Sequence, residues 1–447
     1  MSGASRATDS NGRRRTFAAL VVCLFGIGHW PLLAGGDREP VAAAPDAVEI
    51  EFWETQTSIG SYTRVADELT GSYNSLNDDV TVRYQVIPWD GWYQVFFTAV
   101  MSGRGPDVSG GAFPQPIQYA MLGETLDLSP ILEAWRDERP GFVEGFVDGA
   151  LPLYQYEGKQ VGLPRFVDPR VITYRTDVLA DLGIEALPTT WQELEQLCRT
   201  IQARTDLAPL VLKAGDIMAT HVLLHFMLQA DSGIVDERGE PAVDTAGTVE
   251  ALRFLQRMYQ DGLIAAAAIR MRGDEARATY LRGEAAMIFS YPFSQEAEAS
   301  DVLSSSAVLP VLRGPGGDQR VLSWIAPIMA YRQTSSQEAT LDFVKWWIEN
   351  ADPVWTVGRF PFLPAHTSLW DEVVRESNAL LYEVANKVMP HAVLPMWPLE
   401  SLFPEFHRIE GENLLGAALT SVLLGRASPE EAATRLQAEI ELIFYGG

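Results

Sequence analysis

The chain has 447 residues, of which 47% are hydrophobic and 21% charged, and its formal net charge is −25. A chain of this length is expected to divide into two or more lobes rather than fold around one core. The ordinary composition argues against long disordered segments. The negative charge opposes binding to nucleic acid or to anionic lipid headgroups.

The first 44 residues predict an export signal. A basic patch, Arg13-Arg14-Arg15, precedes a short apolar run, and the small-residue segment PVAAAPDA follows. The pair Arg14-Arg15 also fits a twin-arginine pattern, which leaves Sec-type and Tat-type export open. Cys23 weakly resembles a lipoprotein box, so lipid anchoring is a minority alternative. A membrane anchor is disfavoured because Gly and Pro interrupt the apolar run. We therefore expect a periplasmic or otherwise extracytoplasmic protein.

The next segment predicts alternating strands and helices. Apolar and acidic residues alternate over 48–53, which indicates a strand. A helix over 61–74, a strand over 80–87 and a helix over 92–101 are expected to follow. A turn, a short strand and a Gly-rich exit occupy SGRGPDVSGGAF. This order predicts a mixed α/β sheet with helices on its faces.

A break rich in Gly and Pro over 158–173 separates this region from a second α/β run. Thr190 with Glu193 predicts a capping box at the start of a strong helix, and Ser428 with Glu431 predicts the same for the closing helix. Between them we expect a helix ending at Gly262, strands over 286–291 and 320–330, and an amphipathic helix over 336–350.

No residue pattern predicts catalysis or a bound metal. The six histidines are scattered, and His221 and His225, four residues apart, lack the glutamate of a zinc-binding helix. The chain contains no phosphate-binding Gly-Lys-Ser/Thr loop, no nucleophile elbow and no recognisable pair of catalytic carboxylates. We therefore expect no cofactor, no metal and no enzymatic activity.

Aromatic residues recur at strand ends and in loops beside polar residues. Any one of them is explained most simply by core packing. As a set they suggest a ligand crevice, because crevices of open α/β sheets lie at the carboxyl ends of strands. Sugar rings stack on aromatic faces and exchange hydrogen bonds with carboxylates, Arg and amides. The set comprises Trp53, Tyr291, Phe293, Trp324 and Trp397.

Several motifs, taken together, resemble one family. They are IEFWETQ, VMSGRGPDV, GETLDLSPIL, the long segment GKQVGLPRFVDPRVITYRTDVLADLGIEALPTTWQEL, YLRGEAAMIFSYPF and VGRFPFLPAH. Their order over most of the chain is similar to that of the extracellular solute-binding proteins of ATP-driven importers, the carbohydrate-binding type that includes the maltose-binding proteins. The chain departs from the family pattern at Thr173-Tyr174-Arg175, where an apolar residue and then Tyr-Asn or Tyr-Asp are usual.

The resemblance implies an α/β fold of two lobes joined by hinge strands, with a ligand captured between them by hinge closure. Each lobe would be discontinuous, with crossings near Arg165–Arg170, Phe293 and Glu349–Gly358. The boundaries it implies are 1–44 for the export signal, 45–165 and 293–350 for lobe 1, and 166–292 and 351–447 for lobe 2 with the C-terminal helices.

Motif positions also imply a set of ligand-binding residues. Asp168 lies where maltose-type proteins place an acid on the sugar, although a salt bridge with Arg165 or Arg170 that fixes the hinge is an equal alternative. Phe293 and Tyr291 match the aromatic that stacks on the sugar ring. The full set is Trp53, Glu54, Gln56, Asp168, Arg170, Tyr291, Phe293, Trp324, Arg359, Phe360 and Trp397.

The resemblance implies that the chain is a monomer that captures a sugar or oligosaccharide and delivers it to the transmembrane permease subunits of an ATP-binding-cassette importer. Two alternatives stay open. One is an exported carbohydrate-active enzyme, and the other is a binding protein for a non-sugar solute such as a polyol or polyamine.

Overall fold

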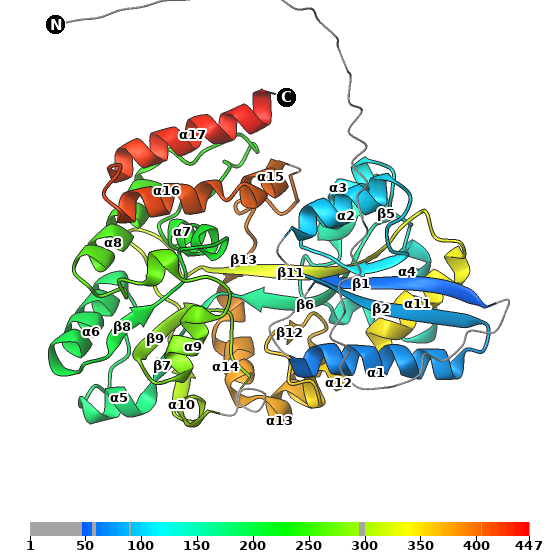
Figure 1. Cartoon of the computed structure of the whole chain (residues 1–447), viewed down its shortest axis with the longest axis horizontal. Helices are drawn as coiled ribbons and strands as arrows, with labels where there is room; N and C mark the ends of the chain where they lie inside the picture. The colour runs from blue at the N-terminus through cyan, green and yellow to red at the C-terminus, as the bar shows by residue number, and fades with distance from the viewer. Residues whose placement is uncertain (1–46, 56–59, 89–90, 295–299, 404, 447) are drawn as a thin grey trace, which may run out of the picture. The chain divides into compact units, whose positions relative to one another are not determined.

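The structure is a computed structural model that describes residues 47–446 except 56–59, 89–90, 295–299 and 404. The expected export signal and Cys23 therefore lie outside the described residues. From Ala44 to Gly447 the chain clusters as one compact unit. It contains two main sheets, a two-stranded ribbon and many helices (Figure 1).

The first sheet has seven strands in the order β12-β6-β11-β3-β1-β2, with β13 pairing with β11. β1 pairs in parallel with β2 and β3, whereas β11 is antiparallel to both β3 and β6. Its strands are β1 (Val48–Thr55), β2 (Val80–Ile87), β3 (Val108–Gly110), β6 (Leu163–Pro169), β11 (Val321–Ala330), β12 (Leu363–Pro364) and β13 (Ala392–Val393). We call the elements built on this sheet the first lobe.

The second sheet has four strands in the order β10-β7-β9-β8. They are β7 (Val171–Arg175), β8 (Ala208–Val211), β9 (Ala285–Ser290) and β10 (Ser306–Val308), and all six residues of β9 are buried. We call the elements built on it the second lobe. The separate ribbon pairs β4 (Gln155–Tyr156) with β5 (Lys159–Gln160).

Arg170 is the one residue between β6 of the first sheet and β7 of the second. The chain returns to the first sheet between β10 and β11, after Val308. β6 and β11 therefore lie side by side at the junction of the two lobes (Figure 1).

The helices cover both sheets. Up to the second lobe they are α1 (Gly60–Leu76), α2 (Trp92–Met101), α3 (Gln115–Met121) and α4 (Ser129–Glu138). Next come α5 (Thr176–Asp181), α6 (Trp191–Arg204), α7 (Met218–Gln229), α8 (Ala246–Gln260), α9 (Glu275–Leu281) and α10 (Asp301–Ser304). The last are α11 (Gln337–Glu349), α12 (Pro353–Thr356), α13 (Arg375–Ser377), α14 (Ala379–Lys387), α15 (Glu405–Gly411), α16 (Leu414–Leu423) and α17 (Pro429–Tyr445).

The C-terminal helices belong to the second lobe by their contacts. α16 packs against α7 and α8, and α17 packs against α8 and α16 (Figure 1). Every residue of α7 is buried, because α16 covers one of its sides and β11 contacts another. α15 contacts both α16 and α17, so the position of α15 is set by the second lobe.

The local predictions agree with this arrangement. The mixed α/β class is confirmed, and β2 and α2 have the predicted bounds. Both capping boxes form, with Thr190 Oγ1 accepting from Glu193 N at 3.2 Å and Ser428 Oγ accepting from Glu431 N at 3.1 Å. These features depend on residues three or four apart, so a single sequence contains the information that specifies them.

The sequence predicts that the chain returns to the first lobe near Phe293, but the strand pairing puts this return later in the chain. β10 follows Phe293 in the chain but pairs with β7, with Val308 opposite Thr173. The second sheet therefore continues past the predicted boundary. β12 and β13 pair with β6 and β11, so the first sheet likewise contains strands beyond the boundary expected at residue 350. The other boundaries stay a proposal.

Candidate functional site

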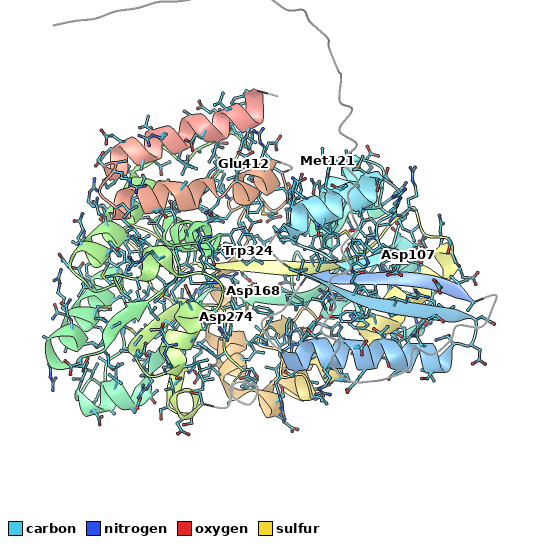
Figure 2. The ribbon with its side chains drawn as sticks, viewed as in Figure 1. Asp107, Met121, Asp168, Asp274, Trp324 and Glu412 are labelled. Atoms are coloured by element: carbon cyan, nitrogen blue, oxygen red, sulfur yellow. The ribbon has the colours of Figure 1, made fainter. Side chains whose placement is uncertain are left out.

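The junction of the lobes brings together two residues that the sequence singled out. Asp168 on β6 lies directly opposite Trp324 on β11 in the antiparallel register, so both side chains project from the same face of the sheet. Figure 2 shows both residues in the middle of the molecule, where the two sheets meet. The Asp168 side chain is 16% exposed, so it is not fully buried.

A chain of polar side chains extends from Asp168 through three further residues. Arg170 donates to Asp168 Oδ1 and, through Nε, to His221 Nδ1 at 3.1 Å. The Nε2 atom of His221 lies 3.4 Å from Glu410 Oε1. With Trp324, these four residues form what we call the crossing cluster, whose members come from β6, the β6–β7 junction, α7, α15 and β11.

Burial sets the protonation of the crossing cluster. It raises the pKa of Asp168, which the Arg170 guanidinium partly offsets. Burial, with the nearby Arg170 charge, holds the pKa of His221 well below its usual value, so this imidazole is neutral. Burial also raises the pKa of Glu410 to about 7, against the opposing effect of Arg170.

Aromatic rings surround Trp324. Its ring centroid lies 5.6 Å from that of Phe113, 5.8 Å from that of Phe406 and 4.7 Å from that of His221. Phe113 precedes α3 of the first lobe, and Phe406 lies on α15. The Trp324 Nε1 atom is buried and has no hydrogen-bond partner within the described part of the chain. An unpaired buried donor costs free energy unless a ligand or water satisfies it.

Glu54 lies in a different place from the crossing cluster and has protein partners. It forms an ion pair with Arg165 and accepts from Tyr62 Oη and Tyr84 Oη at 2.7 and 2.8 Å. The residue is 1% exposed. Phe360 stacks on Tyr62 with centroids 4.4 Å apart. Glu54 and Phe360 therefore share one structural cluster in the first lobe, and their ligand role stays a prediction.

Tyr291 and Phe293 meet at Arg277. The Arg277 guanidinium carbon lies 4.1 Å from the Tyr291 ring centroid and 3.8 Å from that of Phe293. Phe293 is fully buried and stacks on Tyr280, so it presents no ring face to solvent. Tyr291 is half-buried. Arg277 also acts electrostatically on Asp168, which links this pair to the crossing cluster.

The remaining predicted site residues are dispersed. Trp53 is half-buried against Phe96, and its Nε1 has no partner among the described residues. Arg359 donates to the carbonyl of Ser377 at 3.0 Å. The Trp397 ring lies under Arg320, 4.1 Å from its guanidinium carbon. Gln56 lies outside the described residues.

Sequence reasoning missed three residues around Trp324. Phe113 and Phe406 carried no motif, and Glu410 was one acid among 59 Asp and Glu residues. Phe406 and Glu410 are four residues apart on α15, so they share a helix face, but a seven-residue helix is too short to give a periodic signal. His221 and His225, which lack the glutamate of a zinc-binding helix, are both buried.

Three other features of the described residues lie apart from the crossing cluster or concern other kinds of site. A surface hollow of about 740 Å³ beside β8, lined by residues such as Thr205, Ala265 and Arg282, contains none of the predicted site residues. Among the described residues, no three His, Cys, Asp or Glu side chains gather where they could hold a metal ion. In the described ranges no helix has both the length and the apolar character needed to cross a bilayer.

Comparison with known proteins agrees with this architecture. A curated protein of Brucella abortus (strain 2308), named as a binding protein, is 22% identical over 421 residues, which cover 92% of this chain and 97% of its own. The diacetylchitobiose binding protein DasA of Streptomyces coelicolor is 32% identical over 132 residues, 29% of each chain.

Solved structures show the same fold. The sugar transporter of Arthrobacter chlorophenolicus A6 with bound laminaribiose matches with a TM-score of 0.81 at 23% identity, over 88% of this chain and 98% of its own. Maltose-bound MalE3 of T. maritima matches with a TM-score of 0.76 at 19% identity, over 89% and 100%. These likenesses confirm the expected two-lobe fold.

The match to a protein-family model, rather than any one relative, establishes the family of this chain. The model described as bacterial extracellular solute-binding protein matches residues 54–352, which run from the end of β1 to the residue before α12. This range includes all of the second sheet and, of the first sheet, the strands β2, β3, β6 and β11. The chain belongs to the bacterial extracellular solute-binding protein family.

Proposed function

We propose that this protein is the exported substrate-binding component of an ATP-binding-cassette importer, and that it captures a sugar or oligosaccharide at the crossing cluster. Family membership supports a binding role. The sugar-bound relatives support the ligand class, because laminaribiose and maltose are named for two solved structures of this fold.

One observation in particular supports the location. At the crossing cluster, aromatic rings around Trp324 adjoin an unpaired buried indole N–H and two partly exposed carboxyl groups, Asp168 and Glu410. The unpaired donor and the two carboxyl groups suit the hydroxyls of a sugar, and the buried rings of Phe113 and Phe406 pack against Trp324 beside them. The two lobes meet here at Arg170, so hinge closure would act directly on a bound ligand.

Isothermal titration calorimetry with laminaribiose, maltose, N,N′-diacetylchitobiose and putrescine would test the ligand class. We expect at least one saccharide to bind and putrescine to give no heat. Binding of putrescine alone would refute the sugar assignment, and release of monosaccharide from any of the saccharides would favour an exported enzyme.

The importer role needs a separate test. The liganded protein should stimulate ATP hydrolysis by permease subunits encoded beside its gene and reconstituted with their ATPase, since closure is the state the permease reads. A liganded protein that leaves the hydrolysis rate unchanged would contradict this role. We expect the protein itself to elute as a monomer in size-exclusion chromatography.

A further inference from the structure

Glu410 has one carboxyl oxygen in use and one available. Its Oε1 contacts His221 Nε2 at 3.4 Å. In the part of the chain that the structure describes, the carboxyl makes no other hydrogen bond or ion pair. The side chain is 14% exposed. Oε2 is therefore an acceptor without a partner among the described residues, on a side chain that is not fully buried.

The hydrogen-bond direction along the crossing cluster fixes what Glu410 can accept. A guanidinium only donates, so His221 Nδ1, which receives Arg170 Nε at 3.1 Å and Nη2 at 3.0 Å, must be unprotonated. The neutral imidazole then carries its proton on Nε2 and donates to Glu410 Oε1. His221 thereby holds the Glu410 carboxyl in one orientation, with Oε2 directed away from the ring.

Trp324 supplies the complementary group. Its Nε1 is an unpaired donor, and its ring contacts the same imidazole that Glu410 contacts. Phe406, one helical turn before Glu410, packs against the Trp324 ring. The Trp324 ring and the Glu410 carboxyl thus contact the same His221 ring, and each carries one polar atom without a partner among the described residues.

The charged groups that act on the crossing cluster come from several elements. Arg170 acts electrostatically on both Asp168 and Glu410, and Arg277 on α9 acts on Asp168. Lys213, which acts on His221, is paired with Asp216.

We propose that Glu410 is a specificity-determining residue of this site, and that it selects ligands in which one hydroxyl donates to Glu410 Oε2 while a second hydroxyl of the same sugar ring accepts from Trp324 Nε1. The inference rests on the proposed function and extends it to a residue outside the recognised motifs. His221 is the positioning residue that orients Glu410.

The test is the dissociation constant of laminaribiose, maltose and N,N′-diacetylchitobiose at pH 5.5 and pH 8, for the native chain, Glu410→Gln and Glu412→Gln. Glu412 is the matched control, because it lies two residues away, its side chain is 49% exposed, and its one ion pair among the described residues is with Arg408. A hydrogen bond to a charged group corresponds to roughly a tenfold change in affinity or more.

For any sugar that binds, the native chain should bind about tenfold more tightly at pH 8 than at pH 5.5, because the hydroxyl donates to the ionised carboxyl. Glu410→Gln should bind about tenfold more weakly than the native chain at pH 8 and show little pH dependence, because the His221 N–H occupies the amide oxygen and leaves an NH₂ donor in place of the acceptor. Glu412→Gln should match the native chain at both pH values.

Native-like affinity of Glu410→Gln at pH 8 would overturn the inference while leaving the proposed function intact. Failure of the native chain to bind any of the three sugars would overturn the proposed function, and this inference with it. Putrescine binding that is lost in Glu410→Gln would overturn the hydroxyl assignment in favour of a cation. The melting temperature of Glu410→Gln should be measured at pH 8. A value equal to or above that of the native chain would show that weak binding does not come from unfolding.

Discussion

Replacing Arg165 by Met should destabilise the protein strongly. The Arg165 side chain is 9% exposed and that of its ion-pair partner Glu54 is 2% exposed. Arg165 also donates through Nε to the carbonyl of Pro327 at 3.0 Å. Without the guanidinium, the Glu54 carboxylate would keep only two neutral phenol donors, Tyr62 and Tyr84.

The magnitude follows from that burial. Removing one partner of a buried ion pair leaves an uncompensated charge and costs about 3–5 kcal/mol. The two tyrosine hydroxyls already donate to the carboxylate and limit the loss, so we expect about 3 kcal/mol for Arg165→Met. Glu54→Leu with Arg165→Met should recover part of this loss, because no charge then remains buried.

Urea denaturation followed by tryptophan fluorescence would measure these changes from the midpoint and slope. Arg64→Met is the matched control, since Arg64 and Glu68 form an i,i+4 pair whose side chains are 53% and 46% exposed, and such pairs contribute at most about 0.5 kcal/mol. A loss below about 1 kcal/mol in Arg165→Met, or a double variant less stable than the single one, would refute the reasoning.

Two further outcomes concern Phe293 and Glu410. Phe293→Ala should lower the free energy of unfolding by about 3–5 kcal/mol, because the ring is fully buried between Tyr280 and Arg277; an unchanged melting temperature with weakened sugar binding would instead favour the stacking role implied by the motif. The folded-state pKa of Glu410, about 7, lies above its ordinary value of 4.5. Between pH 4.5 and pH 7 the folded protein therefore keeps a proton on Glu410 that the unfolded chain has released. Native stability should therefore fall as pH rises from about 4.5 to 7 and stay lower above 7. Glu410→Gln lacks this loss and should gain about 3 kcal/mol relative to the native chain between pH 4.5 and pH 8 in thermal or urea unfolding; parallel stability curves for the two proteins would contradict the raised pKa.

The elements of this protein are largely encoded by neighbouring residues. Alternation of apolar and acidic residues was enough to predict most of the β1 strand, and the side chains of Thr190 and Glu193 were enough to predict the start of α6. The ordered motifs predicted the family, because they mark strand ends, turns and helix starts that recur in one order along the chain.

The partners of charged and aromatic residues depend on long-range contacts. The sequence left open whether Asp168 pairs with Arg165 or Arg170, and the structure pairs it with Arg170 while Arg165 crosses to Glu54. That second pair joins residues 111 positions apart, so no local spacing predicts it. The lobe return expected near Phe293 failed for the same reason, since β10 is assigned to its sheet by pairing with β7.

What the sequence by itself determined is therefore many of the helices and strands, the α/β class and the family, because each rests on local spacing or on the order of motifs. Only the tertiary structure decided which side chains meet at the junction of the lobes. Glu410 lies 189 residues from His221 along the chain, and it reaches the crossing cluster because α15 is held by helices that pack on the second lobe. The burial that sets its proton affinity exists only in the folded state.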